Sequence, residues 1–230
     1  MDIDINKNLR DVREKISEVT FASGREGKEV RLLAVSKTYP AEMIKLAYDS
    51  GQRMFGENKV QELEVKAPAL PKDIEWHLIG HLQSNKVAKA VEFAAYIHAV
   101  DSIKLIDRID RIAGEKNKTP KILLEVNISG EASKFGITTK EIEVLAETAL
   151  KCENLELVGL MTMAPFGADE NELSSVFSSL RKLRDLLQKK YNVTLPELSM
   201  GMSSDFAIAI KEGSTIVRIG TSIFGHRNYN

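Results

Sequence analysis

One lysine of this sequence stands where a reactive amine is useful. Lys37 directly follows the segment 31–36, an apolar run with the composition of a buried strand, and Pro40 then introduces a helix-forming segment at 41–49. In parallel α/β proteins the chemistry lies where strands end. An amine at the edge of an apolar core is partly desolvated, which lowers its pKa and makes it a better nucleophile. A strand that simply ends on a solvated charge has the same sequence, so this stretch alone leaves both interpretations open.

Two later loops are suited to hold an anion. They are residues 199–205 (SMGMSSD) and 218–222 (RIGTS). Their glycines, Gly201 and Gly220, let the backbone approach a ligand closely, and each loop opens a predicted helix whose first N–H groups favour negative charge. Either loop alone is better explained by a helix cap and a turn, but the two loops together favour a phosphate site. The hydroxyl groups of this predicted phosphate site come from Ser203, Ser204 and Thr221.

A lysine and a phosphate site at one edge of a fold suit a single ligand, pyridoxal phosphate. Its aldehyde forms a Schiff base with a lysine, and its phosphate needs an anion site. Arg218, at the end of the last predicted strand, is placed to face the pyridine nitrogen. A permanently charged guanidinium there keeps that nitrogen unprotonated and weakens the ring as an electron sink. An ion pair between Arg218 and a carboxylate at the same edge is the simpler alternative.

Strand and helix patterns alternate along the chain and give the elements that position these residues. A helix over 5–22, with apolar residues on one face, precedes the first strand. Strands are predicted at 31–36, 53–55, 74–78, 96–100, 121–126, 156–160, 197–200 and 215–219. Eight β/α units without a linker predict an α/β fold, a (β/α)8 TIM barrel with an extra N-terminal helix. We expect residues 1–230 to form a single domain, in which 1–28 supply the N-terminal helix and turn.

The main alternative is an open doubly wound sheet, which usually has fewer strands and a glycine-rich first turn. The first turn here, residues 36–40, contains no glycine, so the dinucleotide-binding fingerprint is absent. A length of 230 residues also fits one barrel, for which roughly 250 residues are usual. In such a barrel the two anion-binding loops follow the seventh and eighth strands, where barrels commonly bind phosphate.

Composition limits the partners. The chain has 32 Lys and Arg against 33 Asp and Glu, a net charge of −1, which is not the basic footprint of a nucleic-acid or membrane-surface binder. The single cysteine, Cys152, has no partner for an internal disulfide, so we expect a reducing cytoplasm. The first seven residues lack the apolar region of a signal peptide, and no apolar run reaches the roughly 20 residues of a membrane span. We expect a monomer.

Other residues offer weaker signals. His77 and His81 are four positions apart, but Gly80 lies between them at the end of a predicted strand, so they do not share a helix face and we predict no metal site. The segment 134–136, in the long loop 127–138, is equally consistent with a ligand contact and a surface turn. Cys152 follows a predicted helix, and we expect a structural thiol rather than a reactive one.

Six motifs, spread through nearly the whole chain, carry the most specific signal. They are residues 35–40 (VSKTYP), 55–62 (FGENKVQE), 76–86 (WHLIGHLQSNK), 159–163 (GLMTM), 198–205 (LSMGMSSD) and 217–221 (VRIGT). Together they closely resemble the motifs of the pyridoxal phosphate homeostasis protein family. The resemblance implies a fold-type III barrel similar to the N-terminal domain of alanine racemase, with Lys37 as the Schiff-base lysine. The further cofactor-binding residues that it implies are Asn58, Ile79 and Met200 along the ring, Arg218 near the ring nitrogen, and Ser203, Ser204, Gly220 and Thr221 at the phosphate.

Three functions fit these residues. The first is a pyridoxal phosphate binder that acts in intracellular vitamin B6 and amino-acid homeostasis, with pyridoxal phosphate-dependent apo-enzymes as partners. The second is a racemase-like enzyme of weak activity, and the third is a Schiff-base aldolase acting on a sugar phosphate. Racemisation needs a base on each face of the ring. In alanine racemase the second base comes from a further β domain, which we expect this chain to lack, although Tyr39 or a histidine remains a candidate. We therefore favour the binder.

Overall fold

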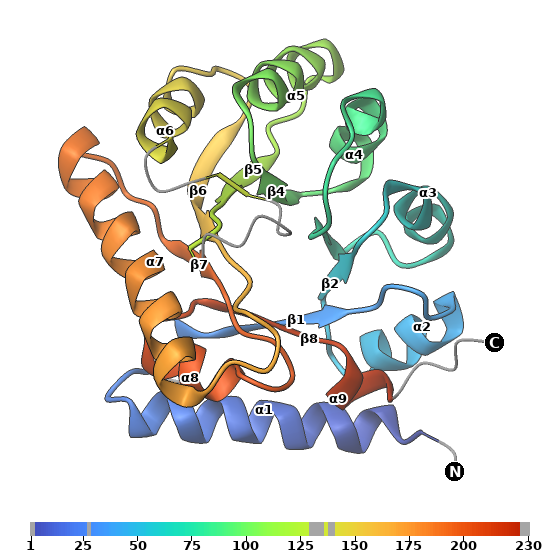
Figure 1. The fold of residues 1–230 in the computed structure, drawn as a ribbon. Coiled ribbons are helices and arrows are strands. Elements are labelled where there is room, and N and C mark those ends of the chain that lie inside the picture. The colour runs from blue at the N-terminus through green and yellow to red at the C-terminus, as the bar shows by residue number, and fades with distance from the viewer. Residues whose placement is uncertain (1–2, 27–28, 129–135, 138–140, 226–230) are drawn as a thin grey trace.

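Eight parallel strands close into a barrel in sequence order, and β8 pairs with β1 (Figure 1). In this computed structural model, residues 3–26, 29–128, 136–137 and 141–225 are described. The strands are β1 (Arg31–Val35), β2 (Met54–Glu57), β3 (Glu75–Leu78), β4 (Tyr96–Val100), β5 (Lys121–Glu125), β6 (Glu156–Met161), β7 (Glu197–Ser199) and β8 (Ile216–Ile219). The predicted (β/α)8 TIM barrel is confirmed.

Helices surround the barrel on its outside (Figure 1). They are α1 (Ile5–Ala22), α2 (Ala41–Asp49), α3 (Val60–Ala69), α4 (Val87–Phe93), α5 (Ile103–Lys116), α6 (Ile142–Leu150), α7 (Glu170–Tyr191), α8 (Phe206–Lys211) and α9 (Thr221–Phe224), with a 3-10 turn η2 (Ser84–Lys86). Among the described residues, no helix is both long and apolar enough to cross a bilayer.

The extra helix α1 completes the outer ring. The helix after β8, α9, has only four residues and is too short to cover the adjacent strands. Helix α1 has 18 residues and packs beside α2, α8 and α9 along the outside of the barrel (Figure 1). Its apolar stripe, which includes Leu9, Val12 and Ile16, is buried there. Asp4 caps the helix by accepting a hydrogen bond of 2.9 Å from the backbone N–H of Lys7.

Most predicted element boundaries are correct to within one or two residues. The segments 5–22, 41–49 and 96–100 match the observed elements at both ends. The strand predicted at 53–55 was too short, because Gly56 and Glu57 also pair with β3.

The inside of the barrel differs from the layer between strands and helices. That outer layer is an extended apolar core. Inside the barrel, the second apolar cluster is small and consists of Tyr96, Ala99, Leu123, Val158 and Met161. Six polar residues of the strands are also buried, with at most 5% of their surface exposed: Glu57, His77, His98, Glu125, Ser199 and Arg218. Because buried polar groups are costly unless they are hydrogen-bonded, their partners decide what this interior can do.

Candidate functional site

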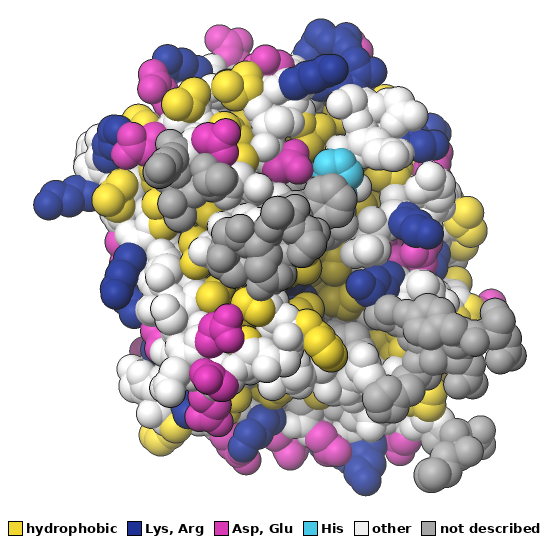
Figure 2. All heavy atoms as spheres, viewed as in Figure 1, with side chains coloured by type: hydrophobic (Ala, Val, Ile, Leu, Met, Phe, Trp, Pro, Cys, Tyr) yellow, Lys and Arg dark blue, Asp and Glu magenta, His cyan; other side chains and the backbone are white. Residues whose placement is uncertain are grey.

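The predicted site residues lie at one end of the barrel. All strand pairs are parallel, so their carboxyl ends share that end. These residues follow or end five of the strands. Lys37 follows β1, Asn58 follows β2 and Ile79 follows β3. Met200, Ser203 and Ser204 follow β7, and Arg218, Gly220 and Thr221 belong to the end of β8 and the start of α9. On the face seen in Figure 2, acidic and basic side chains are interspersed, so no patch of one sign surrounds the barrel on that face.

Glycines bring neighbouring loops of this end into close contact. A Cβ atom at Gly80 would lie 2.3 Å from the carbonyl oxygen of Asn58, so the loops after β2 and β3 can touch only with glycine there. A Cβ at Gly220 would lie 3.1 Å from the carbonyl oxygen of Val35, which places the loop after β8 against the end of β1. The predicted phosphate loop is therefore adjacent to the turn that carries Lys37.

The turn of Lys37 is strained and well anchored. Lys37 is half-buried, and the turn is closed by a 3.1 Å hydrogen bond from the Tyr39 N–H to the Ser36 carbonyl. Thr38 has a φ of 71°, a left-handed conformation that is unfavourable for a β-branched residue. Its N–H donates a 2.7 Å hydrogen bond to Glu62 Oε2 on α3, which holds the backbone in place.

Four residues form what we call the Lys37 clamp: Ser36, Glu57, Glu62 and Lys66. The ammonium of Lys66 donates to Glu57 Oε1 at 2.8 Å, to Glu62 Oε2 at 2.7 Å and to the Ser36 carbonyl at 3.1 Å. The Ser36 hydroxyl donates to Glu57 Oε1 at 2.7 Å. The clamp thus joins β1, β2 and α3 directly beneath the turn of Lys37.

The clamp contains a carboxyl group that titrates near neutral pH. Burial raises the pKa of Glu57 from 4.5 to about 7, although the hydrogen bonds and charge of Lys66 act in the opposite direction. Glu57 Oε2 is the one buried side-chain polar atom among the described residues without a hydrogen-bond partner. Burial alone would also raise the pKa of Glu62, but hydrogen bonds from Lys66 and from the Thr38 N–H lower it.

The loop after β7 is shaped around a glycine. Gly201 has a φ of 94°, and a Cβ there would lie 2.6 Å from the Cβ of Ala209. The side chain of Asp205 turns back to accept a 2.5 Å hydrogen bond from the Met202 N–H, so its carboxylate is used within the loop. Within the described part of the chain, the hydroxyls of Ser203, Ser204 and Thr221 have no protein hydrogen-bond partner. They are therefore available to a phosphate group.

Arg218 is buried and is bound only by neutral oxygens. Its Nη1 donates to the Ser199 carbonyl at 2.7 Å and to Ser199 Oγ at 2.8 Å, and its Nη2 donates to the Thr162 carbonyl at 3.0 Å. Burial lowers the pKa of Arg218 to about 10, so the guanidinium is charged at neutral pH. Among the described residues it forms no direct ion pair, although the charges of Asp205 and Glu125 favour its charged form. Three of its five N–H groups are used, which leaves two for a ligand.

The residues expected along a ligand ring differ in exposure. Asn58 and Ile79 are half-buried, whereas Met200 is fully buried beneath the mouth of the barrel. Ile79 packs over Gly56, because a Cβ at Gly56 would touch its Cδ1 at 3.4 Å. A cavity of about 290 Å³ opens beside Asn58, and His81, Gln83 and Lys86 are among its lining residues.

The two histidines considered for a metal have separate roles. His77 is fully buried and hydrogen-bonded to His98, while the more exposed His81 lies 3.4 Å from Asp101. No group of three or more potential metal ligands is found in the described part of the chain. Of the segment 134–136, only Gly136 is described; Lys134 and Phe135 lie outside the described residues.

Sequence reasoning missed the residues that support the site. Glu57 lies in a motif that was noted, but its burial depends on pairing between β2 and β3. His98 and Ser199 lie in short strands and carry no recognisable spacing. Glu125, at the end of β5, is also buried, and burial together with the charge of Asp101 raises its pKa to about 7.

Comparison with known proteins identifies the family. The pyridoxal phosphate homeostasis protein of Aquifex aeolicus (strain VF5) is 43% identical over 224 residues, which cover 97% of this chain and 98% of that protein. The human protein of the same name is 44% identical over 237 residues, covering 96% of this chain and 86% of its own length. This chain belongs to the pyridoxal phosphate homeostasis protein family. The family model described as alanine racemase, N-terminal domain, also matches residues 6–228.

Solved structures of members and more distant proteins share this barrel. PipY of Synechococcus elongatus PCC7942, solved without pyridoxal phosphate, is 40% identical, with a TM-score of 0.89 over 96% of this chain and all of that chain. The same protein solved with pyridoxal phosphate bound has a TM-score of 0.85 at 39% identity, with the same coverage. Alanine racemase from Corynebacterium glutamicum is 13% identical with a TM-score of 0.74, over 99% of this chain and 62% of that one. This last similarity is one of fold alone.

Proposed function

We propose that this member of the pyridoxal phosphate homeostasis protein family binds pyridoxal phosphate as a Schiff base on Lys37. In this proposal it serves intracellular vitamin B6 and amino-acid homeostasis rather than robust catalysis. The observation that carries the proposal is the position of the anchored Lys37 turn directly against the loop of Gly220, where hydroxyls without protein partners are available. The relative PipY, solved with pyridoxal phosphate bound, supports the same ligand.

The residues at the barrel mouth fit the parts of this cofactor. When bound, pyridoxal phosphate supplies an aldehyde that captures amines and a ring that withdraws electrons. The amine of Lys37 would hold the aldehyde carbon, and Arg218 would lie near the ring nitrogen. Because the guanidinium is already positive, it disfavours a proton on that nitrogen and so limits carbanion chemistry. In the proposed site the ring is lined by Asn58, Ile79 and Met200, and the phosphate is held by Ser203, Ser204, Gly220 and Thr221.

A visible absorption spectrum with added pyridoxal phosphate tests the proposal. The wild type is expected to develop a yellow band that borohydride bleaches, and Lys37→Ala is expected to lack it because no amine remains at the end of β1. Lys59→Ala is the matched control, since Lys59 is an exposed lysine on the same rim. A wild type that stays colourless contradicts the proposal. An adduct with a sugar phosphate instead would favour the aldolase.

A weak racemase-like activity is the second candidate function. The near-neutral pKa of Glu125 favours it, because a carboxyl that exchanges protons at neutral pH suits proton transfer. Tyr39 is less suited as a base, since its hydroxyl donates a 2.5 Å hydrogen bond to the Gly225 carbonyl. Exchange of the α-proton of L-alanine in deuterated water separates the two functions. Exchange that Glu125→Gln abolishes would establish the racemase, whereas a binder shows none.

The same proposal also indicates which class of protein receives the pyridoxal phosphate. A protein that stores pyridoxal phosphate in the cytoplasm needs partners that accept it, and pyridoxal phosphate-dependent apo-enzymes are the chemical class that does so. We propose that the protein acts as a monomer. Activation of such an apo-enzyme by the loaded protein, faster than by Lys37→Ala mixed with the same total pyridoxal phosphate, is the expected result.

A further inference from the structure

A line of buried polar side chains runs through the barrel interior and ends at Arg218. It begins at Glu75, the first residue of β3, whose side chain is 37% exposed. Glu75 Oε1 lies 3.0 Å from His77 Nε2, and His77 Nδ1 lies 2.8 Å from His98 Nε2. His98 Nδ1 lies 2.9 Å from the hydroxyl of Ser199, which also accepts the bond from Arg218. We call Glu75, His77, His98 and Ser199 the polar chain.

The two ends of the polar chain set the direction of every hydrogen bond within it. A carboxylate can only accept, so a neutral His77 gives its Nε2 hydrogen to Glu75 and accepts at Nδ1 from His98. Nδ1 of His98 is then an acceptor, and the hydroxyl of Ser199, which accepts from the guanidinium of Arg218, donates its hydrogen to it. His98 therefore carries its hydrogen on Nε2 and donates it to Nδ1 of His77. His77 in turn donates from Nε2 to Glu75, whose pKa is lowered chiefly by this hydrogen bond. Every donor has an acceptor while both imidazoles are neutral.

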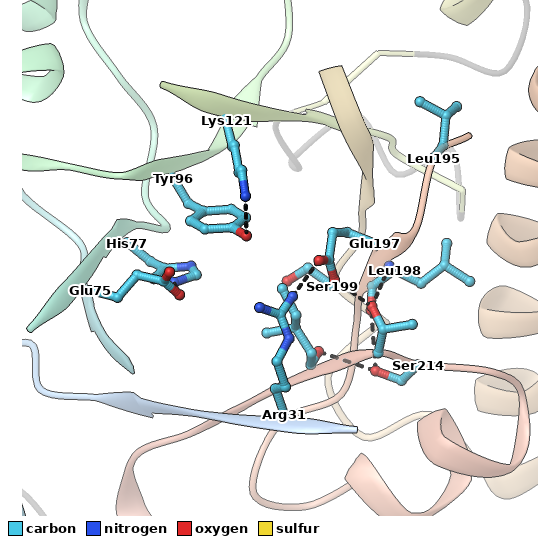
Figure 3. A network of polar contacts seen from close by, with 12 residues as sticks. Arg31, Glu75, His77, Tyr96, Lys121, Leu195, Glu197, Leu198, Ser199 and Ser214 are labelled. Atoms are coloured by element: carbon cyan, nitrogen blue, oxygen red, sulfur yellow. Dashed lines mark hydrogen bonds and ion pairs between the residues drawn. The ribbon is translucent and has the colours of Figure 1, made fainter. Parts of the chain in front are cut away.

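The surroundings keep both imidazoles neutral. Burial lowers the pKa of His77 and lowers that of His98 well below 6.5. The charge of Arg31 acts in the same direction on both, although Arg31 is itself paired with Glu197. Figure 3 shows His77 beside Glu75 and Tyr96, and Arg31 beside Glu197. The rings of Tyr96 and His77 are stacked, with their centroids 4.3 Å apart.

We propose that the polar chain positions the guanidinium of Arg218 for the ring nitrogen of pyridoxal phosphate. The inference rests on the proposed function. Ser199 Oγ is one of three acceptors that orient Arg218. It is the only one of the three whose orientation is fixed by a further side chain, because its hydroxyl group is also hydrogen-bonded to His98. The acceptors hydrogen-bonded to Arg218 are all neutral, so none of them forms an ion pair with the guanidinium. A carboxylate at the opposite end of the barrel, Glu75, thereby acts on the ligand site without touching it.

Nitrogen NMR of the ligand-free protein tests the direction of the chain. The sequence contains four histidines, so spectra of protein labelled with ¹⁵N-histidine are simple to assign with His77→Gln and His98→Gln. Both His77 and His98 are expected as neutral Nε2–H tautomers from pH 6 to 8. Glu75→Ala removes the last acceptor and is expected to give His77 a mixture of tautomers. Three results would overturn the inference whether or not pyridoxal phosphate binds. They are a charged imidazole, an Nδ1–H tautomer at His98, and a His77 tautomer that is unchanged in Glu75→Ala.

Two buried serines then test the link to the ligand. Ser199→Ala breaks the chain, whereas Ser214→Ala removes an equally buried hydroxyl that donates to the Met200 carbonyl at 2.7 Å and makes no bond to the chain (Figure 3). We expect Ser199→Ala to weaken pyridoxal phosphate binding by about three- to tenfold and to shift the ¹⁵N resonance of the bound ring nitrogen. Ser214→Ala is expected to change neither.

The outcomes separate this inference from the proposed function. A wild type that binds no pyridoxal phosphate contradicts the proposed function. A wild type that binds it, together with Ser199→Ala and Ser214→Ala variants that shift the ring-nitrogen resonance equally or not at all, contradicts only the role of the polar chain.

Discussion

The two cationic residues at the barrel mouth are supported in different ways. The turn of Lys37 rests on charged groups, with Lys66 between Glu57 and Glu62, and one oxygen of Glu57 lacks a partner among the described residues. Arg218 rests on hydroxyl and carbonyl oxygens, and two neutral imidazoles follow behind Ser199. The groups hydrogen-bonded beneath the Lys37 turn therefore include one that titrates near neutral pH, whereas those hydrogen-bonded to Arg218 do not.

The difference matches the chemistry proposed for each residue. A lysine that captures and releases an aldehyde must change its protonation state, and a clamp whose net charge varies near pH 7 lies beside such a group. An arginine that faces a ring nitrogen must keep its charge. The hydrogen-bond partners of Arg218 are neutral, and the charges of Asp205 and Glu125 favour its charged form. The barrel thus combines an ionic support and a neutral support at one end.

The largest expected effect comes from removing the cation of the clamp. Lys66→Met leaves two carboxylates without their shared partner, and we expect the free energy of unfolding to fall by about 4 kcal/mol at pH 8. Lys151→Met is the matched control, because Lys151 forms an ion pair with Glu147 at the same i,i+4 spacing on an exposed helix face. We expect a change of at most about 0.5 kcal/mol there. Urea unfolding measures both, and equal losses would show that the clamp is no more than a surface ion pair.

A smaller effect is expected from one serine in each support. Ser36→Ala removes a hydrogen bond to Glu57 and should cost about 2 kcal/mol at pH 8, but less at pH 6, where Glu57 is largely protonated. Ser199→Ala should cost about 1 kcal/mol at both pH values, because its partners do not titrate in this range. Urea unfolding at the two pH values checks the contrast. A loss of stability in Ser199→Ala that differs between the two pH values would contradict this contrast.

The smallest expected effects are pH slopes of opposite sign. The pKa of Glu57 is raised on folding, so its contribution to stability is complete below about 4.5 and is lost as the pH rises through 7. The pKa of His98 is lowered, so its contribution is lost as the pH falls through 6.5. Relative to Glu57→Gln, the wild type should lose about 1 kcal/mol of stability between pH 6 and pH 8. Relative to His98→Gln, it should lose about 1 kcal/mol between pH 8 and pH 5.5. Slopes of the same sign would contradict the assignment of one support as ionic and the other as neutral.

Much of the fold could be predicted because it follows from local patterns. Alternating strand and helix segments specify a parallel barrel, and a parallel barrel brings the ends of its strands together regardless of side-chain detail. Lys37 and the loops 199–205 and 218–222 were therefore placed at one end of the barrel from the sequence alone.

The hydrogen-bond partners that support Lys37 and Arg218 could not be predicted, because they depend on how side chains of different elements meet in space. His77 is in register with Tyr96, and its contact with His98, two residues further along β4, arises only when both side chains face the interior. Glu57 and Lys66 meet because α3 packs back onto β2 at one particular depth. No spacing of residues in the sequence predicts either arrangement.

The central claim is that Lys37, held between these two supports, carries pyridoxal phosphate. The most direct test is mass spectrometry of peptides after the protein has been loaded with pyridoxal phosphate and reduced with borohydride. We predict a stoichiometric phosphopyridoxyl group on the peptide that contains Lys37 and none on the peptide that contains Lys59, the exposed lysine on the same rim. A label spread over surface lysines, or one that persists at the same level in Lys37→Ala, would contradict the claim.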